Sequence, residues 1–365
     1  MSLNIGIVGL PNVGKSTLFN ALTKKSVPAE NFPFCTIDPS VGVIAVPDER
    51  LDLLTKFSKS KKTIPAAIQF VDIAGLVKGA ALGEGLGNKF LTNIRETDAI
   101  LEVVRIFEDD KIIHVDGKVD PLFDIEIINL ELATADLQTV INRLEKIGRD
   151  VKRGDKGAIL ENYVLEKFKK ALTDGKLASS VGLEEKEKPV AESLHLLTFK
   201  PILYCLNKKA GGKNLDELGD ERFQKLIKFL EESGSKWVIV DAGIEHELKD
   251  FEREEKNQFR KELGSDHDGI DDLITKGYEL LGLMTYFTTG EDETRAWTVL
   301  KNSTAPVAGT AIHTDFKEKF IKAEIINWQK LLEAGSYSAA REKGWVRTEG
   351  KEYVVQDGDV IEFKI

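Results

Sequence analysis

The residues with the clearest chemical purpose stand near the N-terminus, where the sequence from Gly9 to Ser16 reads G-x-x-x-x-G-K-S. In this pattern the glycines let consecutive backbone N–H groups converge on phosphate oxygens, the lysine brings a positive charge to the β- and γ-phosphates, and the serine hydroxyl can bind Mg²⁺. We therefore predict a P-loop that binds a nucleoside triphosphate through Asn12, Val13, Gly14, Lys15, Ser16 and Thr17.

Two further segments carry residues that a P-loop enzyme needs around the γ-phosphate. Asp72 ends an apolar run, where an acidic residue can hold the metal through water, and Gly75 can offer its backbone N–H to the γ-phosphate. Thr36 stands where switch-type NTPases place a second hydroxyl ligand. We expect Ser16, Thr36 and Asp72 to form the Mg²⁺ site, with Lys15 and Gly75 stabilising charge on the transferred phosphoryl group.

The residue after Gly75 is Leu76, whereas many switch GTPases have a glutamine there that orients the attacking water. Another group must then position the water, or hydrolysis must be slow. His114 lies in a suitable loop beyond the fourth expected strand, although a purely structural role is the alternative for a lone histidine.

The choice of base depends on the segment from Asn207 to Ala210. A guanine-specific site has an aspartate at the last of these positions, and a site without that acceptor loses the discrimination it provides. Ala210 offers only a methyl group, which favours ATP over GTP. We expect Asn207 and Lys208 to contact one side of the base, and Ala242 and Gly243 the other.

The elements that position these residues follow from the apolar pattern. Six short apolar runs predict strands of a mostly parallel α/β sheet, several of them buried on both faces. They are Ile5 to Val8, Val41 to Val46, Ala67 to Val71, Ala99 to Val104, Ile202 to Leu206 and Trp237 to Val240.

The region between the fourth and fifth of these strands has a helical pattern instead. Apolar residues recur there at spacings of three and four, which predicts an antiparallel helical hairpin. One stripe contains Ile127, Leu130, Thr134, Leu137, Ile141 and Leu144, and the other Leu160, Val164, Phe168 and Leu172. The pair could bind a partner or simply bury its own apolar face.

Beyond residue 281 the pattern changes to short, turn-rich strand candidates, which predict a small α+β module on a curved sheet. The candidates are Ala296 to Leu300, Val307 to Ile312, Gly344 to Arg347, Lys351 to Val355 and Val360 to Ile365, with one helix from Ile321 to Leu332.

Composition excludes several classes of protein. The formal net charge of −10 argues against a protein that coats DNA or RNA over its whole surface, so any RNA contact must be local. The two cysteines lack the spacing of a zinc site or a disulfide framework. No apolar stretch is long enough to cross a membrane. These features favour a reducing, cytoplasmic compartment.

Several motifs together resemble the YchF, or Obg-like ATPase, family. They are found at residues 10–16, 31–39, 83–90 and 94–100, and again at 295–298, 313–316 and 354–360, so the resemblance extends over nearly the whole chain. One position departs from it, because the family usually has a glutamate where this chain has Ala210.

The resemblance implies an architecture of three parts. A P-loop domain of the Obg type occupies residues 1–125 and 199–280, a helical coiled-coil arm is inserted at residues 126–198, and a ubiquitin-like β-grasp module of the TGS type follows at residues 281–365. The resemblance also implies slow ATP hydrolysis with a hydrophobic residue at Leu76 and water positioning by His114. Asn12 resembles an asparagine that lets related NTPases use K⁺, but it could equally cap the loop.

The implied partner is the ribosome, either its large subunit or the whole particle, with RNA contacts through the arm or the C-terminal module. The implied role is a nucleotide-dependent switch in translation and stress responses. Two alternatives from the residues remain: a GTP-specific switch, and a nucleotide-gated scaffold that binds RNA or protein with little catalysis.

Overall fold

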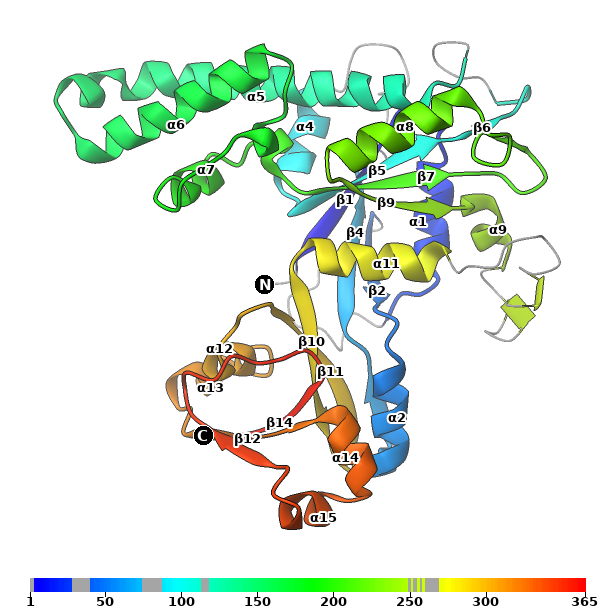
Figure 1. The fold of residues 1–365 in the computed structure, drawn as a ribbon, viewed down its shortest axis with the longest axis vertical. Coiled ribbons are helices and arrows are strands. Elements are labelled where there is room, and N and C mark those ends of the chain that lie inside the picture. Colours follow the sequence, from blue (N-terminus) through cyan, green and yellow to red (C-terminus); the bar gives the residue numbers. More distant parts are fainter. Residues whose placement is uncertain are drawn as a thin grey trace.

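The structure is a computed structural model that describes residues 3–27, 40–73, 87–112, 118–248, 251, 255–256, 258–259 and 269–365. A central sheet carries a long helical arm at one end, and a second sheet lies at the other end (Figure 1). Among the helices in these ranges, none combines the length and apolarity that crossing a bilayer would require.

The central sheet contains all six strands that the sequence predicts. Its order is β2-β4-β1-β5-β7-β9, and only the edge strand β2 runs antiparallel to its neighbour. The bounds are β1 (Asn4–Val8), β2 (Val41–Ala45), β4 (Ala67–Asp72), β5 (Ala99–Arg105), β7 (Ile202–Asn207) and β9 (Lys236–Val240). Because β4, β1, β5, β7 and β9 are parallel, their carboxyl ends meet at one edge, where α/β sheets bind ligands.

Helices cover both faces of this sheet. One face packs α1 (Lys15–Thr23) and α11 (Gly269–Leu280) onto buried residues such as Ile5, Ile7 and Leu101. The opposite face packs α4 (Asn88–Arg95), α5 (Pro121–Lys152) and α8 (Glu221–Glu232) onto residues such as Ile100 and Val104. Burial on both faces explains why the strands read as continuous apolar runs.

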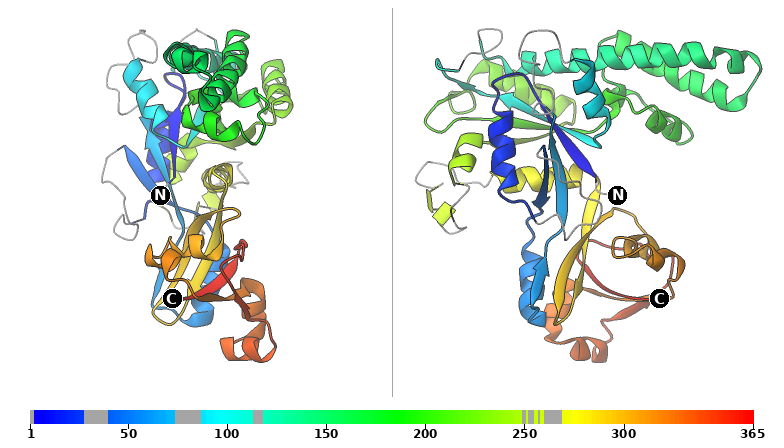
Figure 2. Two further views of the ribbon diagram at one scale, coloured as in Figure 1. Left: turned by 90° about the vertical axis from the view of Figure 1, so that its left-hand side faces the viewer. Right: turned by 180° about the vertical axis from the view of Figure 1, so that it is seen from behind.

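The arm is the predicted antiparallel hairpin, formed by the distal part of α5 and by α6 (Lys156–Thr173). Val140, Val164 and Phe168 are fully buried between the two helices, and the arm projects well beyond the sheet in Figure 1 and in the right view of Figure 2. The chain returns through η3 (Ala178–Ser180), α7 (Lys188–Ser193) and η4 (Leu197–Phe199). The first helix begins at Pro121, ahead of the boundary expected at residue 126.

The predicted apolar stripe on the first arm helix is wrong in its proximal half. Leu130 is 66% exposed and Thr134 is exposed, whereas Ile125, Ile128 and Leu132 are buried. The reason is that this half of α5 lies on the sheet and must turn a different face inward from the half that packs on α6. A single stripe cannot serve both partners.

The C-terminal sheet has the order β13-β12-β14-β10-β11-β3. Its strands are β3 (Lys62–Ile64), β10 (Leu283–Thr289), β11 (Glu293–Leu300), β12 (Lys322–Asn327), β13 (Arg347–Glu349) and β14 (Asp359–Lys364). Strands β10 and β11 form an antiparallel hairpin, and β14 pairs in parallel with β10. The helices around it are α12 (Ala305–Gly309), α13 (Asp315–Glu318), α14 (Trp328–Ala334) and α15 (Tyr337–Glu342).

Several predictions for this region are wrong. The expected strand from Lys351 to Val355 is a turn with an isolated bridge at Val354, and only Arg347 of the expected strand from Gly344 to Arg347 lies in β13. The expected strand from Val307 to Ile312 is replaced by α12 and a turn, because Pro306 lacks the N–H that a strand ladder needs yet fits the first turn of a helix. The first half of the expected helix from Ile321 to Leu332 is β12, in which Ala323 and Ile325 face inward while Lys322 is exposed. This alternation has the period of a strand. The hairpin strand β10 was not predicted.

Besides the direct passage from α11 to β10, a second connection joins the two sheets. Between β2 and β4 the chain leaves the central sheet, forms α2 (Glu49–Ser58) against the C-terminal sheet, and adds β3 in parallel to the edge strand β11. Arg50 on α2 binds Asp357 at 2.5 Å and lies over the ring of Phe287. Residues 49–64, which the sequence assigns to the nucleotide domain, therefore help to build the C-terminal one.

We predict that Leu54→Ala weakens this connection. Leu54 is fully buried on α2, so its truncation is expected to lower the free energy of unfolding by about 2–5 kcal/mol, measured as a fall in the urea midpoint. Leu53→Ala is the matched control, since Leu53 is 43% exposed and its truncation is expected to cost less than about 0.5 kcal/mol. Equal losses of unfolding free energy for both variants would contradict the burial of Leu54 between α2 and the C-terminal sheet.

Candidate functional site

The segment between β1 and α1 has the backbone of a phosphate-binding loop. Gly9, Asn12 and Gly14 have φ angles of 145°, 61° and 101°, all in the left-handed range. A Cβ on Gly9 would lie 2.5 Å from the carbonyl oxygen of Val103, and one on Gly14 would lie 2.3 Å from Nδ2 of Asn207. Side chains are thus excluded at both glycines, because β5 and β7 press against the loop.

Lys15, the first residue of α1, turns back over the loop. Its Nζ donates to the carbonyl oxygens of Gly9 at 2.9 Å and Leu10 at 2.6 Å. Burial lowers the pKa of Lys15 to about 8, and the carboxylate of Asp72 opposes that shift. The ammonium group is therefore poorly solvated, which favours an exchange of its two carbonyl partners for phosphate oxygens.

Two of the three predicted metal ligands lie in the described ranges. Ser16 is exposed in the first turn of α1, and Asp72 is 7% exposed at the end of β4, where it pairs in register with Ile7 of β1. A hydroxyl and a carboxylate are the oxygen donors that Mg²⁺ prefers, and the action of Asp72 on the pKa of Lys15 shows that its charge reaches the loop. Thr36, Gly75, Leu76 and His114 fall outside the described residues.

Asn207, the last residue of β7, joins the loop to the expected base segment. Its Nδ2 donates to the carbonyl oxygen of Val13 at 2.8 Å, and its Oδ1 accepts from the N–H of Ala242 at 3.0 Å. The side chain is 4% exposed. The residue predicted to touch the base thus also holds together the two segments that must flank it. This role was not predicted.

The segment that follows is shaped by Asn214. Its Oδ1 accepts from the N–H of Lys209 at 2.9 Å, and its Nδ2 donates to the carbonyl oxygen of the same residue at 2.8 Å. Glu217 binds both Asn214 and the ammonium group of Lys208, at 3.1 and 3.2 Å. The Lys208 side chain is therefore directed to Glu217.

The role of Arg105 was not predicted either. It is 1% exposed at the end of β5, and its guanidinium donates to the carbonyl oxygens of Phe107, Ile112 and Asp109 at 2.9, 3.1 and 3.4 Å. These contacts fold the loop just before His114. Strands β6 (Phe107–Glu108) and β8 (Lys213–Asn214) pair antiparallel, and Asp109 forms an ion pair with Lys209, so this loop is tied to the base segment. The available signal was a charged residue directly after the predicted buried strand from Ala99 to Val104.

On the side of α9 (Ala242–Glu247), Ala242 is buried and Gly243 is exposed. Asp241 precedes them and caps the helix, with its Oδ1 accepting from the N–H of Ile244 at 2.9 Å. Burial raises the pKa of Asp241, and the backbone N–H groups of Ile244, Ala210 and Gly243 oppose that rise. The carboxyl group of Asp241 therefore adjoins Ala210, the position at which a guanine site carries its aspartate.

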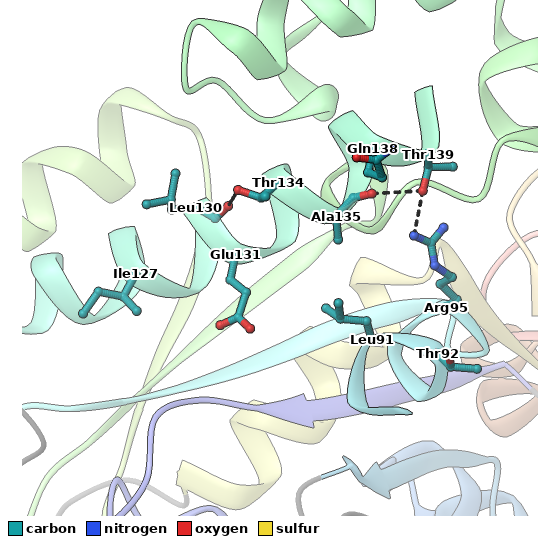
Figure 3. A pocket seen from close by; sticks show the side chains of 10 residues that line it. All are labelled: Leu91, Thr92, Arg95, Ile127, Leu130, Glu131, Thr134, Ala135, Gln138 and Thr139. Atoms are coloured by element: carbon teal, nitrogen blue, oxygen red, sulfur yellow. Dashed lines mark hydrogen bonds between the residues drawn. The ribbon is translucent and has the colours of Figure 1, made fainter. Parts of the chain in front are cut away.

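A separate cleft of about 910 Å³ lies between α4 and α5 (Figure 3). Leu91 and Leu130 form part of its apolar lining, and Arg95 crosses it to donate to Oγ1 of Thr139 at 2.9 Å. None of its lining residues belongs to the P-loop or to the base segment. The cleft is thus distinct from the nucleotide site.

Comparison with protein families gives two matches. A family model described as 50S ribosome-binding GTPase matches residues 4–143. A model for the C-terminal part of YchF GTPases, described as a protein of unknown function (DUF933), matches residues 283–365.

Similar proteins match over the full length. The chain is 51% identical to "Ribosome-binding ATPase YchF" of Bacillus subtilis (strain 168), covering 100% of this chain and 99% of that protein. It is 48% identical to the protein of the same name from Haemophilus influenzae, with the same coverage. Among solved structures, the Schizosaccharomyces pombe YchF GTPase matches with a TM-score of 0.90 and 40% identity, covering 100% of this chain and 98% of that one.

The pKa of Lys15 leads to a prediction about pH. Below pH 8 the ammonium group is already protonated before a triphosphate binds, whereas above pH 8 the protein must take up a proton on binding. We expect the affinity for ATP to be level below pH 8 and to fall about tenfold between pH 7 and pH 9. Calorimetry in two buffers of different ionisation enthalpy would detect the proton uptake. An ATP affinity that stays level from pH 7 to pH 9, with no effect of the buffer, would contradict the binding of phosphate by a Lys15 side chain of lowered pKa.

Proposed function

The chain belongs to the YchF family of P-loop NTPases, and from this premise we propose that it binds ATP in preference to GTP and hydrolyses it slowly as a ribosome-associated switch. The full-length similarity to proteins named ribosome-binding ATPase supports both the activity and the partner. A cytoplasmic location, and a role in translation and stress responses, belong to the same proposal.

The observation that carries the proposal is the joined loop and base segment. Asn207 holds the P-loop beside α9, so the residues expected to bind phosphate and base lie along one edge of the sheet. At that edge Ala210 presents a methyl group where a guanine site has a carboxylate with two free oxygens. The names of the relatives include both ATPase and GTPase, so the preference for ATP rests on this local chemistry.

The catalytic roles follow from the same arrangement. Ser16 and Asp72, together with Thr36, would hold Mg²⁺, which when bound neutralises charge on the β- and γ-phosphates. Lys15 and the backbone N–H of Gly75 would stabilise the transferred phosphoryl group, and His114 would orient the attacking water. Arg105 supports the last role, since it folds the loop that leads to His114. Asn12 would give K⁺ a place beside the phosphates.

The distal end of the arm fits a contact with RNA on the ribosome. Within residues 143–156 six basic residues stand against three acidic ones, although the whole chain is acidic. The basic side chains are all exposed, and they are Arg143, Lys146, Arg149, Lys152, Arg153 and Lys156. Such a local cluster attracts phosphate groups without making the whole protein a nucleic-acid binder. The C-terminal sheet, as a TGS-type module, would offer a second contact.

The base preference can be tested by calorimetric titration with ATP and with GTP. Because guanine would lack its charge-assisted acceptor at Ala210, we expect ATP to bind at least about tenfold more tightly. Repeating the titration with Na⁺ in place of K⁺ is expected to weaken binding if Asn12 and the phosphates share a K⁺ ion. Selective, tight retention of GTP or GDP would overturn the proposal in favour of a GTP-specific switch.

Turnover tests the role of His114. Unstimulated ATP hydrolysis should be slow, and His114→Ala is expected to reduce it by roughly a hundredfold or more while leaving ATP binding nearly unchanged, since the side chain acts on water. His313→Ala is the matched control, because His313 is 65% exposed on the C-terminal domain beside Asp315. A brisk rate that survives the loss of His114 would rule out this role.

A further inference from the structure

The junction between β9 and α9 contains a buried carboxyl oxygen, Oδ2 of Asp241, that lacks a hydrogen bond of ordinary geometry within the described residues, although the N–H groups of Ala210 and Gly243 lie near the carboxyl group. Asp241 is 8% exposed, and its Oδ1 is used to cap α9 through the N–H of Ile244. Its Oδ2 is buried and makes no hydrogen bond within the described ranges. A buried acceptor left in this state is costly, so a partner for it is expected.

The position of Asp241 places this oxygen at the base end of the nucleotide site. Asn207 and Val240 are register partners in the parallel strands β7 and β9, so Asp241 follows β9 where the base segment follows β7. The backbone N–H of Lys208 donates to the carbonyl oxygen of Val240 at 2.9 Å. The next residue along, Ala242, is held by Asn207. The carboxyl group is therefore fixed between the base segment and the segment that packs beside the P-loop.

The number of available oxygens distinguishes the two purines. A guanine-reading carboxylate accepts the ring N1–H and the 2-amine with its two oxygens, whereas the only N–H donors on the Watson–Crick edge of adenine are those of its 6-amine. Asp241 has one oxygen engaged in capping and one left, which suits a single donor. The ammonium group of Lys208 binds Glu217 at 3.2 Å and acts on Asp241 through its charge, without a hydrogen bond to Oδ2.

We propose that Oδ2 of Asp241 accepts a hydrogen bond from the 6-amine of adenine and is a specificity-determining group for ATP. The inference rests on the proposed function, since it assumes that a purine triphosphate occupies the P-loop. In this proposal a carboxyl group beside the backbone of Ala210 takes the part of the acidic side chain that Ala210 lacks.

The test pairs a change in the ligand with a change in the protein. ATP and the triphosphate of purine riboside differ only in the 6-amine, so the ratio of their dissociation constants measures recognition of that group. For the unmodified protein we expect ATP to bind about tenfold more tightly. In Asp241→Ser the ratio is expected to fall to about one, because serine can still cap α9 but has no second oxygen.

A matched control is Asp155→Ser. Asp155 caps α6 in the same way, with its Oδ1 accepting from the N–H of Ala158 at 2.7 Å, but it lies in the turn of the arm. This variant should keep the tenfold ratio. Unchanged binding of the purine riboside triphosphate by Asp241→Ser would show that the variant is folded and that its P-loop is intact.

The outcomes separate the two proposals. A ratio near ten that survives Asp241→Ser, or a ratio near one in the unmodified protein, would overturn the assignment of Asp241 while leaving ATP binding in place. Failure of the unmodified protein to bind either triphosphate would instead overturn the proposed function, and the role of Asp241 with it. Loss of the ratio in Asp241→Ser alone would support the assignment.

Discussion

The nucleotide site depends on the two hydrogen bonds made by the side-chain amide of Asn207. With one hydrogen bond to the carbonyl of Val13 and one from the N–H of Ala242, it joins three loops that are far apart in the sequence. Both partners are backbone groups, and leaving a buried one unpaired costs about 1–3 kcal/mol. The amide also leaves no room for a side chain at Gly14, so the conformation of the P-loop and the position of β7 are set together.

A second constraint joins the nucleotide domain to the C-terminal sheet. The chain between β2 and β4 is shared, since α2 packs on the C-terminal sheet while β3 extends it. The segment that precedes β2 contains Thr36, an expected ligand of the metal. The path along the chain from that residue to the C-terminal sheet is therefore short, and it runs through one strand and one helix. The two sheets are therefore not independent domains, because the segment with α2 and β3 belongs to both.

How well a helix or strand could be predicted from the sequence depended on how many other elements it packs against. The strands of the central sheet are buried on both faces, so an apolar run identified them without further information. The stripe on α5 was misjudged at Leu130, because that helix packs on the sheet with one face and on α6 with another. A strand was wrongly predicted near Val307 from its apolar residues. Pro306, which lacks the N–H that a strand ladder needs, favours the observed helix. The period-two pattern around Ile325 was present in the sequence and was overlooked.

The sequence by itself determined the chemistry of the phosphate site, because the spacing of Gly9, Gly14, Lys15 and Ser16 is a local property of one turn between a strand and a helix. Tertiary structure alone decided how the proposed base site is built. Asn207, Asn214 and Asp241 act through partners on other strands, and the direction of a carboxyl or amide oxygen depends on which backbone groups already occupy its neighbours. Short-range patterns carry no information about such pairings, since these form only when parallel strands place their ends side by side.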